Sequence, residues 1–131
     1  MILQVFINYL IGLVIGYFLE LIYRSIKQKE LIRPLFINLQ MYGLTAAFLS
    51  LIYFLDVTLI LRVLFILFFT TGIEFLVGYS YLKFKKIRLW DYLDQSFNYQ
   101  GLICPLFSLY WLLISLLYFY LITPFFVNIF G

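Results

Sequence analysis

The chain has 131 residues, of which 66% are hydrophobic and 11% are charged, and its formal net charge at pH 7 is +3. A water-soluble domain of this length cannot bury so many Phe, Leu, Ile and Tyr side chains, so the composition predicts a membrane protein. The chain has no histidine and a single cysteine, Cys104. These counts exclude His-based catalytic triads, His-dependent zinc sites and an internal disulfide.

Four apolar segments follow one another along the chain, and each is near the length of about 20 residues that a helix needs to cross a bilayer. The first segment has no basic leader and no small-residue cleavage site, so we expect a retained helix. Pro34 suits the first turn of the second helix, and a short polar break around Asp56 suits a tight hairpin. We therefore expect an all-α integral membrane protein with one four-helix domain, 1–131, built as two helical hairpins from residues 2–23, 35–55, 58–82 and 102–122.

The cations predict how the chain sits in the membrane. The first and third connections hold every Lys and Arg except Arg62. Because cytoplasmic loops are enriched in Lys and Arg, we expect both connections in the cytoplasm and both termini outside, in the cell (cytoplasmic) membrane.

Two glutamates lie towards the cytoplasmic ends of the odd-numbered apolar segments. An acid near the centre of a membrane helix costs roughly 2.5 to 3.5 kcal/mol, so a functional or partner-paired role is expected for Glu74. Glu20 has a simpler alternative, an ion pair with Arg24 at i,i+4 near the interface.

Helical spacing predicts that each segment has one polar or small-residue face. Residues four apart share a face of a helix, and a bundle interior accepts such a face better than lipid does. We expect the four faces to meet: Gly12, Gly16, Glu20 and Arg24; Asn38, Tyr42 and Thr45; Thr70, Glu74 and Gly78; and Cys104, Ser108, Trp111 and Ser115.

An insert at residues 90–101 precedes the fourth segment. As a helix it would carry apolar side chains on one face and Asp91, Asp94 and Asn98 on the other, as in a short amphipathic helix at the cytoplasmic interface. We expect this insert to cover a cavity that contains both glutamates. The two aspartates have the alternative role of keeping the loop soluble.

A weak internal repeat relates the two halves. The tripeptide 34–36, Pro-Leu-Phe, recurs at 105–107, in each case after a glutamate and a basic connection. Two parallel hairpins would place Glu20 and Glu74 at comparable depths.

Several blocks of residues resemble the CmpB-like family described as "putative type IV ABC transporters". The similarity is carried by Gly16-Tyr17, Glu20 and Tyr23-Arg24, by Thr71, Glu74 and Gly78, and by Trp90-Asp91-Tyr92, Asp94, Phe97-Asn98, Gly101, Ile103-Cys104, Phe107-Ser108-Leu109 and Trp111. The resemblance implies a small polytopic membrane protein. Its ABC label implies a separate ATPase, because the chain has no Gly-x4-Gly-Lys-Ser/Thr loop.

These features predict a cytoplasm-facing polar cavity that binds or moves a small polar or cationic solute, or protons. One alternative is a non-transporting structural or regulatory subunit that binds a lipid headgroup or a protein. A second, ranked last, is a lipid-modifying enzyme with Mg²⁺ on Asp91, Asp94 and Glu74. The candidate substrate-binding residues are Glu20, Arg24, Glu74, Asn38, Tyr42, Asp91, Asp94, Asn98, Ser108 and Trp111.

We expect no catalytic residue, resident metal or cofactor. The expected partners are membrane lipids, a second copy that completes the cavity, and a separate ATPase or other membrane subunit. No nucleic-acid partner is expected.

Overall fold

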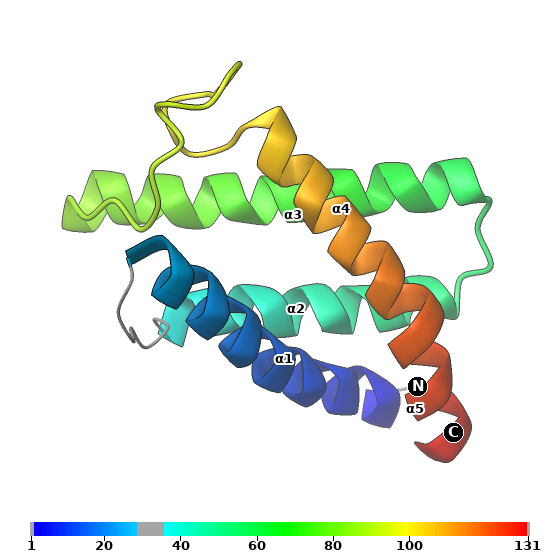
Figure 1. Cartoon of the computed structure of the whole chain (residues 1–131). Coiled ribbons are helices and arrows are strands. Elements are labelled where there is room, and N and C mark those ends of the chain that lie inside the picture. The colour runs from blue at the N-terminus through cyan, green and yellow to red at the C-terminus, as the bar shows by residue number, and fades with distance from the viewer. Residues whose placement is uncertain (1, 29–35, 131) are drawn as a thin grey trace. The chain divides into compact units, whose positions relative to one another are not determined.

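The structure, a computed structural model, describes residues 2–28 and 36–130 (Figure 1). The chain divides into two compact units. Unit 1 comprises Met1–Asp56 and Leu117–Gly131, and unit 2 comprises Val57–Leu116. The backbone of the described residues is almost entirely helical apart from the insert, so the expected all-α class is confirmed.

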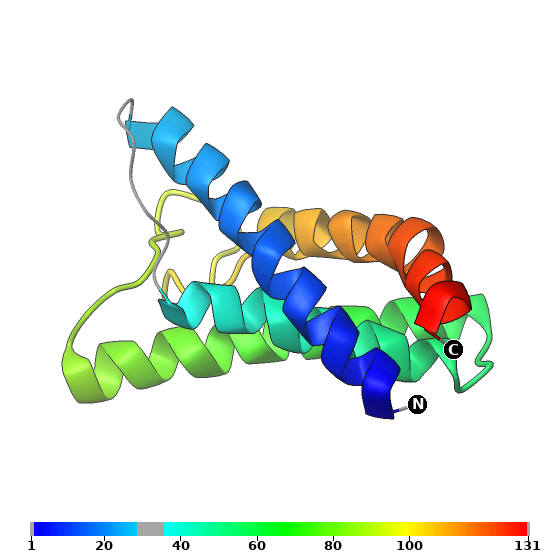
Figure 2. The same cartoon turned by 90° about the horizontal axis from the view of Figure 1, so that it is seen from below.

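Unit 1 contains α1 (Ile2–Gln28), α2 (Phe36–Tyr53), the π-helical turn η2 (Tyr118–Ile122) and α5 (Thr123–Phe130). Helices α1 and α2 run antiparallel, as Figures 1 and 2 both show. They form the first of the two expected hairpins.

The α1–α2 contact depends on glycines. A Cβ atom on Gly12 would lie 2.7 Å from the Tyr42 carbonyl oxygen, and one on Gly16 would lie 2.5 Å from the Tyr42 Cβ. Neither space can hold a methyl group, so the two backbones approach as closely as small-residue seams in membranes allow. This confirms the packing role of the first small-residue face.

A polar contact joins the beginning of α1 to the end of the chain. Tyr118 Oη donates a hydrogen bond of 2.6 Å to Asn8 Oδ1, and Asn8 is fully buried. The rings of Tyr53 and Phe119 also pack with centroids 5.7 Å apart. The C-terminal helical segment is thereby fixed to both helices of the first hairpin.

Unit 2 contains α3 (Leu59–Ser80), the π-helical turn η1 (Tyr81–Lys85) and α4 (Pro105–Leu117). Thr58 caps α3, with its Oγ1 accepting a hydrogen bond of 3.4 Å from the Leu61 N–H. Pro105 begins α4, where its missing N–H costs nothing. The buried residues of α3 recur every four positions, which defines one inward face: Ile66, Thr70, Glu74 and Gly78.

The insert before α4 is a folded loop and not the amphipathic helix considered from the sequence. Phe97, Gln100 and Gly101 have φ values of 58°, 55° and 70°, which no right-handed helix contains. Backbone bonds from Tyr92 N to the Gly101 carbonyl and from Tyr99 N to the Ile103 carbonyl, 3.0 and 2.9 Å long, close the loop instead. The polar and apolar residues that alternate here lie in successive turns of the loop and not on two faces of a helix.

Asn98 is the central residue of this loop. Its Nδ2 donates to the carbonyls of Leu93 and Gln95, at 3.2 and 2.9 Å, and its Oδ1 accepts from the Gly101 N–H at 2.9 Å. The bond to Gly101 satisfies a backbone group where that residue adopts a left-handed conformation.

Several helix ends differ from the expected ones. Helix α1 continues five residues beyond position 23, and the fourth helical segment continues from Pro105 through η2 to Phe130. Pro124 does not end it. The wider turn of η2 ends two residues before the proline, whose ring and missing N–H a regular helix accommodates poorly. Residues 29–35 of the first basic connection, and with them most of the first Pro-Leu-Phe, lie outside the described residues.

Three helical stretches are long and apolar enough to cross a membrane, namely Ile2–Ile26, Leu59–Lys85 and Pro105–Ile129. Helix α2 is apolar but has only 18 residues, which span about 27 Å, close to the hydrocarbon thickness of about 30 Å. The chain is therefore an integral membrane protein with four main helical segments within its described residues.

The glycine seam gives a direct test of the α1–α2 packing. Gly12→Ala should destabilise the folded protein by about 1 to 3 kcal/mol, because the methyl group meets a backbone oxygen that cannot move alone. Gly72→Ala is the matched control: no heavy atom lies within 4 Å of its added Cβ among the described residues. Thermal unfolding in detergent should show a lower midpoint for Gly12→Ala alone, and equal midpoints would contradict this packing.

The loop gives a second test. Asn98→Ala removes three loop hydrogen bonds, each worth about 1 kcal/mol. Backbone amides between residues 92 and 103 should therefore exchange with deuterium faster than in the parent, by about one to two orders of magnitude. Asp94→Ala, at an exposed position of the same loop, should leave the exchange unchanged. Unaltered protection in Asn98→Ala would mean that other contacts hold the loop.

Candidate functional site

The carboxyl group of Glu74 is the centre of the site in unit 2. Glu74 lies in the middle of the inward face of α3 and is only 2% exposed. Its Oε2 accepts hydrogen bonds from Trp111 Nε1, at 2.7 Å, and from Tyr92 Oη, at 3.3 Å. One membrane acid is thus bound by a residue of α4 and by a residue of the insert.

Aromatic packing supports one of the two donors to this acid. Tyr92 stacks on Phe107 with ring centroids 4.4 Å apart and planes inclined by 15°. Phe107 in turn meets the Tyr110 ring edge-on at 5.4 Å. The Tyr92 phenol is therefore held by packing as well as by its hydrogen bond.

A second polar contact lies one turn away. Thr71 on α3 and Ser108 on α4 approach through their hydroxyl groups at 2.9 Å. Each residue lies three positions before a member of the Glu74–Trp111 pair, so the two contacts join the same faces of α3 and α4. Ser108 and Trp111 thus have the inward role predicted for them.

The insert positions Tyr92 through contacts with α3 and with its own backbone. Trp90 Nε1 donates a hydrogen bond of 2.8 Å to the Leu102 carbonyl. A Cβ on Gly78 would lie 3.0 Å from the Trp90 ring, so this glycine allows the indole to lie against α3. Gly78 lies one turn beyond Glu74, and its lack of a side chain allows the insert to pack there.

The two aspartates of the insert take no part in this site. Both are exposed, and Asp91 Oδ1 accepts a hydrogen bond of 2.9 Å from the Leu93 N–H, an Asx-type turn contact. Among the described residues, no three acidic or cysteine side chains gather closely enough to hold a metal ion. The Mg²⁺ site on Asp91, Asp94 and Glu74 is not assembled in this structure. Asn98, the third polar residue predicted on this face, forms hydrogen bonds within the loop.

The second glutamate has its own partners in unit 1. Arg24 Nε donates to Glu20 Oε2 and Tyr42 Oη donates to Glu20 Oε1, both at 3.0 Å. The Arg24 and Glu20 side chains are 18% and 16% exposed. The simpler i,i+4 ion pair considered from the sequence is therefore present, with Tyr42 added from α2.

Asn38 lies one turn before Tyr42 on α2 and is 4% exposed. Its Oδ1 has no hydrogen-bond partner among the described residues. Unit 1 thus gathers four of the predicted residues, Glu20, Arg24, Asn38 and Tyr42, on the facing sides of α1 and α2. Because Glu20 and Glu74 belong to different units, the cavity shared by both acids stays a prediction.

Sequence reasoning missed the polar contacts of four residues. Tyr92 and Thr71 were noted only for the family resemblance, and the Asn8–Tyr118 pair was not noted at all. The available signal for Thr71 was its position three residues before Glu74. Tyr92 could not be assigned, because a non-helical loop has no periodicity that shows which side chain points inward.

Comparison with known proteins assigns the chain to one family. No significant match was found among curated proteins or among solved structures. A family model described as "Putative ABC-transporter type IV" matches residues 7–131. The match includes all four helical segments and the insert that bears Tyr92, so the chain belongs to this ABC-transporter type IV family.

Proposed function

We propose that this chain is a membrane-embedded component of a transport system, in which Glu74 binds protons or a small cation. The observation that carries the proposal is the nearly complete burial of Glu74 together with the two hydrogen bonds that its Oε2 accepts. Membership of an ABC-transporter family supports the transport role.

Two opposing effects act on the Glu74 carboxyl group. Burial among apolar side chains favours the neutral acid, whereas hydrogen bonds from Trp111 and Tyr92 favour the carboxylate. Exchange of a proton for a cation at this carboxyl group is the chemistry that we propose for the site.

The insert acts as a lid in this proposal. Its Tyr92 bond to Glu74, at 3.3 Å, is longer than the Trp111 bond, at 2.7 Å, and is the weaker of the two. Protonation of Glu74 weakens its acceptor capacity further, so the insert is released more readily than α4. The acid would thereby control its own access to the cytoplasm.

Unit 1 contributes the Glu20–Arg24–Tyr42 cluster. We place it near the cytoplasmic side, because the basic connections face the cytoplasm by the distribution of Lys and Arg. The cavity expected from the sequence around both glutamates, completed by a second copy of the chain, is part of this proposal. A separate ATPase would supply the energy for transport.

A non-transporting structural subunit is the second candidate. The Thr71–Ser108 and Glu74–Trp111 contacts support it, because interhelical hydrogen bonds also serve only to join membrane helices. The two candidates differ in whether the charge state of Glu74 changes during function.

Flux separates the two candidates. Protein reconstituted in liposomes should move protons or a monovalent cation, and Glu74→Gln should reduce this flux to background because the amide cannot ionise. Trp111→Phe is the matched control: it loses one hydrogen bond, worth about 1.5 to 3 kcal/mol to a charged group, but keeps the acid and should retain slower flux. A parent that moves neither ion, alone or with its ATPase, would favour the structural role.

Infrared spectroscopy tests the charge change without any transport assay. Between acidic and alkaline pH, the parent should lose a protonated-carboxyl C=O band that Glu74→Gln lacks and Glu20→Gln retains. If the two variants and the parent gave the same pH difference spectrum, Glu74 would not titrate and the proton-exchange role would be excluded.

A further inference from the structure

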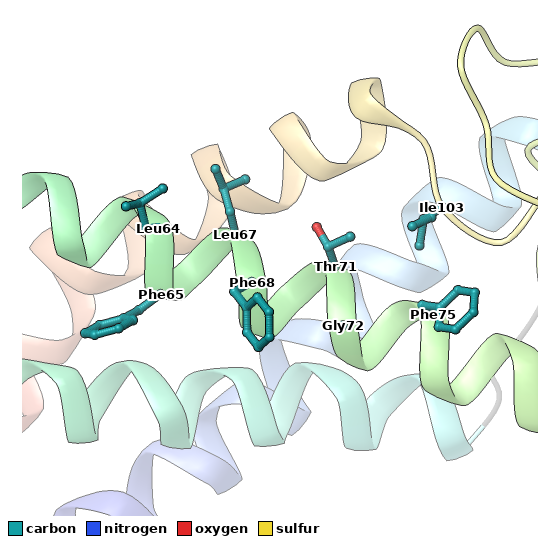
Figure 3. Close-up of a pocket in the computed structure, with 8 residues that line it drawn as sticks. All are labelled: Leu64, Phe65, Leu67, Phe68, Thr71, Gly72, Phe75 and Ile103. Atoms are coloured by element: carbon teal, nitrogen blue, oxygen red, sulfur yellow. The ribbon is translucent and has the colours of Figure 1, made fainter.

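An apolar groove of about 700 Å³ runs along α3 in unit 2 (Figure 3). Figure 3 shows Leu64, Leu67 and Thr71 along one edge of the helix and the rings of Phe65 and Phe68 along the other. Phe75 and Ile103 close its far end. The groove lies within the membrane-crossing stretch Leu59–Lys85.

Gly72 leaves the floor of the groove open. No heavy atom lies within 4 Å of a Cβ placed on it, among the described residues. The polar side chain of the lining, Thr71, already shares its hydroxyl group with Ser108. The groove therefore offers an apolar ligand a fitting shape and a contact area. It offers no free hydroxyl group, because that of Thr71 already bonds Ser108.

An aromatic and basic tract continues from the groove towards the end of the helix. Phe75 stacks on Tyr79 with ring centroids 5.6 Å apart, and Lys83 Nζ lies 5.7 Å from the Tyr79 ring centroid. The spacing of four residues keeps these side chains on one face. The groove thus leads over an aromatic pair to an exposed cation.

The groove alone is about as long as one leaflet of a bilayer is thick. Phe75 lies eleven positions after Leu64, about 16 Å of helix, and half of the hydrocarbon core is about 15 Å thick. Lys83 lies two turns beyond Phe75, and its side chain folds back over Tyr79. An acyl chain in the groove would bring its headgroup towards this ammonium.

We propose that this face of α3 binds one anionic phospholipid, with an acyl chain in the groove and the phosphate at Lys83. A second helix fits less well, because helices pack in membranes along small-residue seams. Here the one glycine is flanked by Phe68, which is 85% exposed, and such a ring holds another backbone away. An acyl chain can bend around it. The inference is independent of the charge state of Glu74.

Native mass spectrometry of the full chain in detergent tests this site, with dioleoyl phosphatidylglycerol and dioleoyl phosphatidylcholine as probes. The anionic lipid should bind about fivefold more tightly, the effect expected for one lysine near a lipid phosphate. Lys83→Gln should abolish this preference. Lys85→Gln, whose Nζ lies over the Tyr81 ring at 4.7 Å, should preserve it.

Gly72→Leu fills the groove and should weaken the binding of both lipids, whereas Leu76→Phe, at an exposed α3 position outside the groove, should not. Circular dichroism should show unchanged helicity in each variant. Equal binding of the two lipids by the parent would overturn the headgroup assignment. If Gly72→Leu kept lipid binding but altered the oligomeric state, another helix would occupy the groove and the proposal would be wrong.

Discussion

The hydrogen bonds to the buried carboxyl group of Glu74 are the interaction on which unit 2 depends. An acid inside a membrane is tolerated only where protein or water replaces its solvation, and here Trp111 and Tyr92 supply two donors. One donor comes from α4 and the other from the insert. The same carboxyl group therefore joins α3 to α4 and holds the irregular segment between them.

That irregular segment is stable because its own polar groups are satisfied. Backbone without regular structure is acceptable at membrane depth only where protein or a water-filled cavity surrounds it. Asn98 bonds three backbone groups of the insert, and Trp90 bonds the carbonyl of Leu102, the next residue after it. These contacts fix the backbone of the insert, so that the Tyr92 side chain can hydrogen-bond to Glu74. In unit 1 the constraint is different: glycines on α1 allow α2 to approach, and Tyr42 then reaches Glu20.

Helical periodicity predicted much of the fold and part of the site. The four-residue spacing of Glu74 and Gly78 on α3, and of Gly16 and Glu20 on α1, predicted the inward faces correctly. The same reasoning failed for the insert, because alternation of polar and apolar residues cannot distinguish a short helix from successive turns. Asp91 and Asp94 were therefore expected near Glu74, whereas they are exposed and Tyr92 contacts the acid. The length of the fourth helical segment was also underestimated, because a π-helical turn that accommodates Pro124 has no simple sequence signal.

The direct measurement of the central contact is the distance between the Glu74 side-chain carboxyl carbon and the Trp111 indole nitrogen. Solid-state NMR of the protein in lipid bilayers, with ¹³C in glutamate and ¹⁵N in the tryptophan indole, reports this distance through dipolar coupling. A hydrogen-bonded pair requires a separation of about 4 Å or less, and the structure predicts a strong coupling that Trp111→Phe removes. If the Glu74 carboxyl carbon showed no coupling to the indole and contacted lipid acyl chains instead, the account of this site would be contradicted.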